Sequence, residues 1–141
     1  MSKNSINGRI VIDTDASKIW EVLTNPDKII LYTGSKTKTD WKVGSPITWE
    51  GEMQGMKYQN KGQVLKNEKN KRLEFTYWSG MGGDQDLPEN YSIVAFELKA
   101  LSDKTTELTY SRIKIPTEME KQIFEEHLQV MLEEIKKLPE Q

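Results

Sequence analysis

Hydrophobic residues recur at steps of three and four throughout residues 117–138, near the end of the chain. This spacing places side chains on one face of a helix. The face holds six residues, Phe124, Leu128, Met131, Leu132, Ile135 and Leu138. An adjacent strip holds three more, Met119, Ile123 and Val130. Thr117 followed by Glu120 is typical of a helix start. The pattern therefore predicts a long helix with an apolar face so broad that something equally broad must cover it.

The N-terminal third of the chain predicts a strand and two short helices. Residues 6–13 hold a β-branched run typical of a strand. Residues 15–24 follow with apolar side chains at helical spacing, after Asp15 as a helix-starting residue. Asn25 and Pro26 then suit the cap and first position of a second helix over residues 27–32, which ends near Gly34.

The middle of the chain changes from helical spacing to alternation of apolar and polar residues. Strands are predicted over residues 35–41, 46–53, 56–66, 72–78, 91–101 and 105–115. Lys36 and Lys38 suit an edge strand, because charged side chains discourage further pairing. One-faced alternation with short turns favours an antiparallel sheet. The predicted fold class is α+β, with the apolar face of the sheet against the long helix.

Composition narrows the class of protein. The chain has 141 residues, 35% hydrophobic and 30% charged, which suits one domain over residues 1–141. A net charge of −2 argues against nucleic-acid binding. The absence of cysteine excludes disulfides and thiolate chemistry. Without a long apolar run, we expect no signal peptide, no membrane span and a cytoplasmic location. No cofactor-binding, metal-binding or catalytic motif occurs, so neither a cofactor nor a metal is expected.

Four segments, in order, resemble a known family. They are residues 16–26 (ASKIWEVLTNP), 41–45 (WKVGS), 62–65 with 72–75 (GQVL, RLEF) and 86–92 (DLPENYS). The chain resembles the START-like superfamily, in the group similar to the C-terminal domain of the activator of Hsp90 ATPase. The resemblance implies a helix-grip fold, in which a curved antiparallel sheet of about six to seven strands surrounds the C-terminal helix. It also implies a cavity that commonly takes an apolar or amphipathic small molecule, or else a protein partner such as a chaperone. Many relatives carry a tryptophan where this chain reads His127-Leu128.

The strand phases predict which side chains face the helix. They are Trp49, Met53, Tyr58, Phe75, Tyr77, Phe96 and Tyr110. Several join an apolar body to a polar tip, which suits the wall of a cavity for an amphipathic ligand. Phe124, Leu128 and Met131 would face them from the helix, and Met56 would add adaptable lining. The alternative is that these residues fill a solid core.

Two ionisable residues are candidates for the same site. His127, the one histidine in the sequence, lies at the margin of the apolar helix face. It could titrate near neutral pH, but without a partner carboxylate it is expected to be a rim residue. Arg112 follows the inward phase of Tyr110, where a ligand carboxylate could pair with it. The cost of burying an unpaired charge instead favours a position in water at the strand end.

The glycine-rich stretch 79–90 matches no phosphate-binding loop. Its acids Asp84, Asp86 and Glu89 lack the order of a calcium loop. A solvated connection is expected there, with a lid over the cavity as the alternative. Three functions stay open at this point: a small-molecule-binding protein, a chaperone-binding module, and an enzyme that would use His127 or Arg112.

Overall fold

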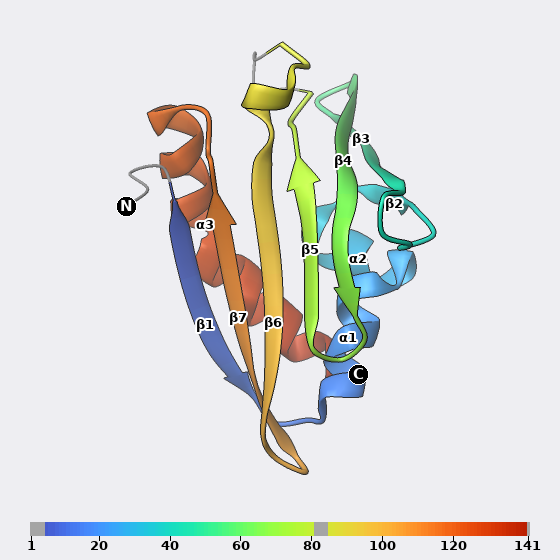
Figure 1. Ribbon diagram of the computed structural model, residues 1–141, viewed down its shortest axis with the longest axis vertical. Helices are drawn as coiled ribbons and strands as arrows, with labels where there is room; N and C mark the ends of the chain where they lie inside the picture. The colour runs from blue at the N-terminus through green and yellow to red at the C-terminus, as the bar shows by residue number, and fades with distance from the viewer. Residues whose placement is uncertain (1–4, 81–84, 141) are drawn as a thin grey trace.

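The computed structural model describes residues 5–80 and 85–140, and within them seven strands form one antiparallel sheet. The strand order is β1-β7-β6-β5-β4-β3-β2, so β1 and β2 are the edges (Figure 1). The strands are β1 (Ile6–Ile12), β2 (Lys36–Lys38), β3 (Pro46–Met53), β4 (Met56–Glu68), β5 (Arg72–Tyr77), β6 (Ser92–Ser102) and β7 (Thr105–Ile113). The fold class predicted from the sequence is confirmed.

The helices form where the capping residues indicated. Asp15 caps α1 (Ala16–Thr24) through a hydrogen bond from the Lys18 amide, and Asn25 caps α2 (Pro26–Thr33) in the same way. The Thr117 hydroxyl accepts from the Glu120 amide at the start of α3 (Glu118–Lys137). Single 3-10 turns occur at η1 (Pro88–Asn90) and η2 (Leu138–Glu140). None of the helices in the described part of the chain has the length and apolarity to span a membrane.

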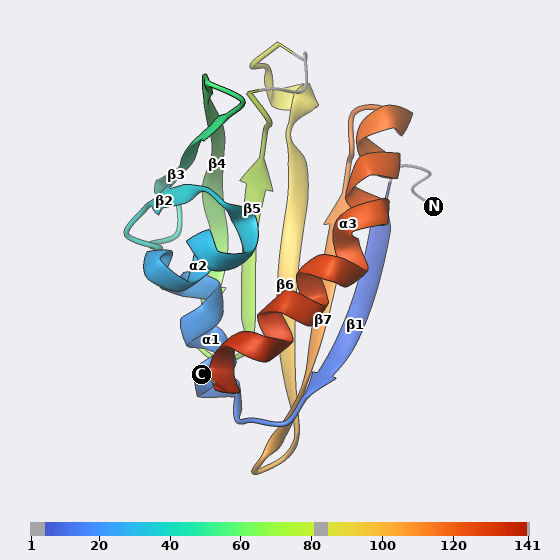
Figure 2. The ribbon, with the colours of Figure 1, turned by 180° about the vertical axis from the view of Figure 1, so that it is seen from behind.

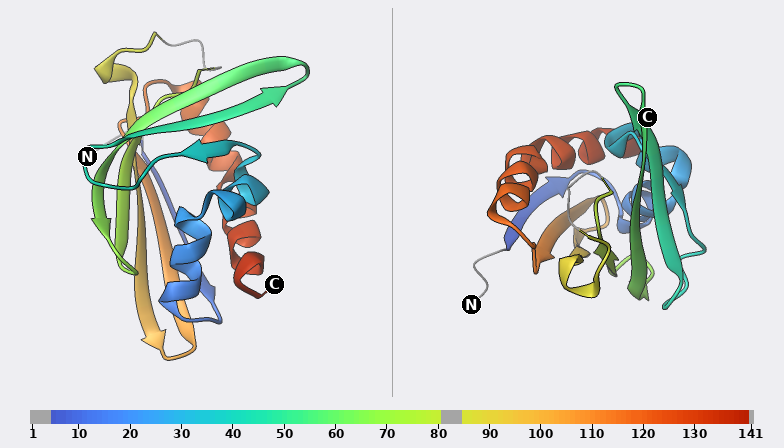
Figure 3. Two further views of the ribbon diagram at one scale, coloured as in Figure 1. Left: turned by 90° about the vertical axis from the view of Figure 1, so that its right-hand side faces the viewer. Right: turned by 90° about the horizontal axis from the view of Figure 1, so that it is seen from above.

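All three α-helices lie on one side of the sheet. Figure 2 shows α3 running obliquely across β6, β7 and β1, with α1 and α2 beside it toward β4 and β3. In Figure 3, the β3–β4 hairpin turns away from the direction of β5, β6 and β7, so the sheet is strongly curved. The helices therefore cover its concave side, and the space between the two layers is where a site can form.

The packing of α3 on β1 explains how the helix is held. Leu132 and Ile135 are fully buried, and Leu128 is nearly so. Gly8 on β1 lets the helix come close, because a Cβ atom there would lie 2.9 Å from Cδ2 of Leu128. Burial of each such leucine or isoleucine contributes about 1.5–3 kcal/mol.

Two sequence expectations about exposed surface are wrong. The adjacent strip of α3 is not covered: Met119, Ile123 and Val130 are 72%, 46% and 61% exposed. The sheet contacts a narrower face of the helix than the hydrophobic pattern suggested. Met56 is 64% exposed at the turn of the β3–β4 hairpin and is therefore not the buried lining residue that was expected.

Several strand ends differ from prediction by one or two residues, and the differences at β2 and β7 change the picture most. β2 has only three residues, which pair with β3 at the edge of the sheet. β7 ends at Ile113, two residues early, because Lys114 adopts a left-handed backbone with φ of 58°. That turn leaves Ile113 40% exposed and brings Ile115 into the core. The alternation of inward-facing and outward-facing side chains along β7 is therefore regular through Arg112 and changes only after it.

Candidate functional site

A cavity of about 350 Å³ lies between the concave face of the sheet and the helices. Nine residues predicted from the sequence line it: Trp49, Met53, Tyr58, Phe75, Tyr77, Phe96, Tyr110, Arg112 and Met131. A second hollow of about 340 Å³ lies closer to α3 and takes in the other three predicted residues, Phe124, His127 and Leu128. Five residues line both spaces, so the two hollows adjoin there: Tyr32, Thr33, Tyr110, Arg112 and Met131.

The wall formed by the two short helices and the segments that follow them was not predicted from the sequence. This wall and its neighbours comprise Leu23, Ile29, Tyr32, Thr33, Ser35, Trp41, Asn60, Ser79 and Val94. The apolar side chains of α1 and α2 were visible in the sequence. These side chains face the cavity because the sheet curves around the two helices. A hydrophobic pattern along the sequence does not reveal that curvature.

Aromatic rings form a continuous path across the concave face. Trp49 contacts Phe75 and Tyr77 with centroid distances of 5.4 and 5.2 Å. Phe96 lies 5.2 Å from Tyr110 in an edge-on arrangement. Tilted and edge-on pairs at these distances are favourable beyond the area they bury. The rings therefore hold one another in place and give the cavity a rigid apolar wall.

A glycine makes room for one of the rings. Gly51 on β3 lies opposite Tyr58 on β4, and a Cβ atom at Gly51 would come within 2.3 Å of the Tyr58 hydroxyl. The missing side chain lets the Tyr58 ring lie across the strand. Its hydroxyl then forms a hydrogen bond of 2.7 Å with Ser35 Oγ, between β4 and the end of α2.

The hydroxyl groups of two further tyrosines in the cavity wall also form hydrogen bonds. The Asn60 amide donates to the Tyr77 hydroxyl over 2.8 Å. Burial raises the pKa of Tyr77, against the opposing effect of the Arg112 charge. Burial also raises the pKa of Tyr32, whose hydroxyl donates to the Val22 carbonyl. Both phenols therefore stay neutral near pH 7 and act as hydrogen-bonding groups.

Arg112 is buried, so the expectation that it lies in water is wrong. Its side chain is 8% exposed. Nε donates to the Tyr110 hydroxyl at 2.7 Å, and Nη1 donates to Ser92 Oγ at 3.3 Å. The guanidinium lies 3.7 Å from the ring centroid of Phe124 and 4.7 Å from that of Tyr77. Aromatic faces and hydroxyls thus replace water around the charge.

His127 is exposed and lies at the rim of the second hollow. Among the described side chains of residues 5–80 and 85–139 there is no group of three or more histidine or acidic residues placed to hold a metal ion. Asp84, one of the acids considered for a cation, lies outside the described residues. The described part of the site therefore offers hydrogen-bonding tips, one cation and apolar walls.

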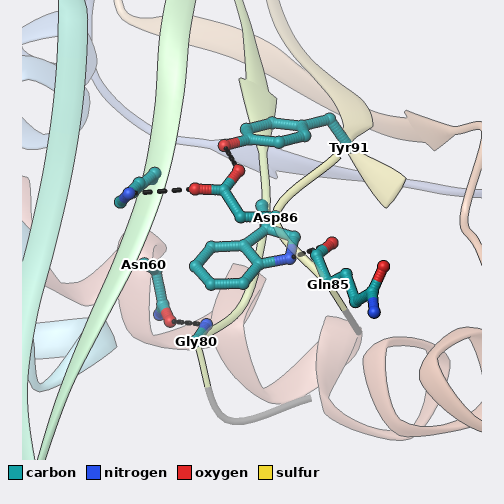
Figure 4. A network of polar contacts seen from close by, with 7 residues as sticks. Asn60, Gly80, Gln85, Asp86 and Tyr91 are labelled. Atoms are coloured by element: carbon teal, nitrogen blue, oxygen red, sulfur yellow. Dashed lines mark hydrogen bonds and ion pairs between the residues drawn. The ribbon is translucent and has the colours of Figure 1, made fainter. Parts of the chain in front are cut away.

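The segment after β5 is fastened to β4 beside the cavity. Figure 4 shows Asn60 accepting a hydrogen bond from the Gly80 amide, 2.9 Å long, and Asp86 accepting one from Tyr91. Lys61 also pairs with Asp86 at 2.9 Å. The hydrogen bonds from Tyr91 and Lys61 lower the pKa of Asp86. Asp86 is thus committed to protein contacts, and Asn60 joins this segment to Tyr77 in the cavity wall.

Comparison with known proteins identifies the family of the chain. A family model described as activator of Hsp90 ATPase homolog 1-like protein matches residues 13–140. No curated protein shows significant similarity to the chain. The solution structure of ChR145 from Cytophaga hutchinsonii is 35% identical, with a TM-score of 0.83 over 99% of this chain and 96% of that one.

Two further solved structures share the fold at lower identity. Protein MLL2253 from Mesorhizobium loti is 19% identical, with a TM-score of 0.78 over 96% of each chain. A structure of the Aha1 dimer from Colwellia psychrerythraea is 20% identical, with a TM-score of 0.71 over 94% of this chain and 93% of that one. Because the family model spans nearly all of the sequence, this chain belongs to the activator of Hsp90 ATPase homolog 1-like family.

Proposed function

We propose that this protein binds a small apolar or amphipathic molecule in the cavity between the sheet and the helices. The observation that carries the proposal is the cavity itself, which is about 350 Å³ and walled by aromatic rings. Ligand sites in proteins are typically about 300–1,000 Å³, mostly apolar, with a few polar groups that orient the ligand. Here the polar groups are the hydroxyls of Tyr58, Tyr77 and Tyr110 and the guanidinium of Arg112.

The energetics favour an occupant that is mainly hydrocarbon. Each Å² of apolar ligand surface removed from water contributes roughly 25 cal/mol. The rigid ring wall adds to this, because a preformed site loses little side-chain freedom on binding. The tyrosine hydroxyls can each accept or donate a further hydrogen bond, which suits a ligand with a polar end.

The test uses the neutral fluorescent probe N-phenylnaphthylamine, whose emission rises in an apolar site. We expect saturable binding to the wild-type protein. Met131→Trp places a larger side chain in the cavity and should weaken that binding about ten-fold or more. Met119→Trp is the matched control, because it makes the same change at a 72% exposed position on the same helix.

The two variants separate a cavity site from surface adsorption. Binding that Met131→Trp weakens and Met119→Trp leaves unchanged supports the proposal. No saturable binding, or equal affinity in both variants, contradicts it. Circular dichroism checks that each variant has the wild-type fold.

A second candidate rests on the family match alone. The family is described by its likeness to an activator of the Hsp90 ATPase, so a chaperone is a proposed protein partner. Purified protein added to Hsp90 should then change its ATPase rate and be retained on immobilised Hsp90. Failure of both assays would remove this candidate and leave small-molecule binding untouched. Under either candidate a cytoplasmic location stays a prediction.

A further inference from the structure

Arg112 is a buried cation with no carboxylate partner among the described side chains of residues 5–80 and 85–139. Its contacts are two neutral hydroxyls and the faces of aromatic rings. A guanidinium stays charged at any physiological pH. Buried charges in proteins are normally paired, because desolvation of an unpaired charge is costly. The arrangement therefore leaves a positive charge that a ligand can neutralise.

The position of Arg112 connects that charge to the cavity. Arg112 lines both hollows, at the point where they adjoin. The rings of Phe124 and Tyr77 lie beside the guanidinium, and Tyr110 and Ser92 occupy two of its donors. The five donors of a guanidinium exceed the two hydrogen bonds made here, so donors remain for a ligand.

The surrounding charges favour a single negative charge on that ligand. Of the described residues lining the two hollows, Arg112 is the one lysine or arginine, so a doubly charged phosphate would find only half of its charge matched. Glu134 is the one carboxylate among the same residues. It lies 3.9 Å from Lys137 and forms no ion pair with Arg112. The planar fork of arginine matches the geometry of a carboxylate.

We propose that the natural ligand is a monocarboxylic acid whose apolar body fills the cavity and whose carboxylate pairs with Arg112. This inference rests on the proposed function and adds the chemical class of the ligand. The two parts of the ligand correspond to the two parts of the site: the ring wall takes the hydrocarbon, and the guanidinium takes the acid group.

The experiment compares naphthylacetic acid with naphthylacetamide, which has the same rings and no charge. Calorimetric titration of the wild-type protein should show the acid binding about ten-fold or more tightly, the size expected of a charge-assisted hydrogen bond. In Arg112→Met the preference for the acid should fall to about two-fold or less. Arg9→Met is the matched control, because it removes an exposed arginine from β1 and should keep the wild-type preference.

A second measurement needs no variant. In ¹⁵N spectra of arginine side chains, the Nε–H signal of Arg112 should shift with the acid and not with the amide. Equal binding of acid and amide, or a preference that survives in Arg112→Met, overturns the inference while N-phenylnaphthylamine binding still supports a cavity site. If none of the three probes binds the wild-type protein, the proposed function and this inference both fall.

Discussion

Replacing Gly51 with alanine should destabilise the protein through its contact with Tyr58. The added Cβ atom would lie 2.3 Å from the Tyr58 hydroxyl and 2.5 Å from Cζ. The ring must move by about 1 Å to reach an ordinary contact distance. That movement breaks the 2.7 Å hydrogen bond to Ser35. The variant tests whether a missing side chain on β3 positions a tyrosine in the cavity wall.

The magnitude follows from three contributions. Overpacking of this kind costs about 1–3 kcal/mol. The lost hydrogen bond adds about 1 kcal/mol. Alanine in a strand recovers roughly 0.5–1 kcal/mol relative to glycine, because glycine loses more backbone freedom on folding. We therefore expect Gly51→Ala to lower the free energy of unfolding by about 1–3 kcal/mol.

A double-mutant cycle makes the test specific. In a Tyr58→Ala background no ring opposes position 51, so Gly51→Ala should become neutral or stabilise by about 0.5–1 kcal/mol. Guanidinium chloride unfolding of all four proteins, followed by circular dichroism, gives the coupling free energy. An equal cost of Gly51→Ala in both backgrounds would refute the reasoning, because the cost would then arise elsewhere than at the ring.

Three further predictions concern the helix, the segment after β5 and the buried arginine. Leu132→Ala should lower the free energy of unfolding by about 2–5 kcal/mol. The control Val130→Ala, at a 61% exposed position on the same helix, should change it by about 0.5 kcal/mol or less. Similar effects of the two substitutions would mean that the sheet packs elsewhere on α3. The lowered pKa of Asp86 contributes stability that is present above its ordinary pKa of 3.8 and is lost as pH falls through the folded-state value. The stability difference between wild type and Asp86→Asn should therefore be constant above about pH 5 and vanish in acid, and a pH-independent difference would contradict this origin. Phe124→Leu keeps an apolar side chain but removes the ring 3.7 Å from the Arg112 guanidinium, so urea unfolding should show a loss of about 1–2 kcal/mol; an unchanged midpoint would show that the stacking is not stabilising.

Local sequence signals predicted the elements well because each has a local physical cause. Asp15, Asn25 and Thr117 cap the three helices through their own side chains, and such contacts span only two or three residues. The alternation over residues 46–53 predicted β3 with its observed bounds. The order of these elements then led to the family and the fold.

Features that depend on distant segments could not be predicted in the same way. We expected Arg112 to lie in water because the sequence offered no partner for a buried guanidinium. The structure brings the rings of Phe124 from α3 and Tyr77 from β5 to 3.7 and 4.7 Å from the guanidinium, contacts that no pattern within β7 reveals. The exposed strip of α3 has a similar cause, since the curvature of the sheet decides how much of the helix it covers.

The candidate site combines both kinds of information. Strand alternation placed Trp49, Phe75 and Phe96 on the concave face, and all three line the cavity. The contribution of α2 through Ile29 and Tyr32 was missed. A helix of eight residues has a clear apolar side, but its partner is set by the three-dimensional path of the chain.

Methionine methyl groups offer the most direct test of whether a small molecule enters the space between sheet and helices. Met53 and Met131 line the cavity, while Met56 and Met119 are exposed outside it. Protein labelled with ¹³C at methionine methyl groups and saturated with N-phenylnaphthylamine should show nuclear Overhauser contacts from the probe to Met131, with weaker ones to Met53 at the rim. Contacts to Met119 or Met56 without any to Met131 would place the probe on the surface and contradict a binding site beneath α3.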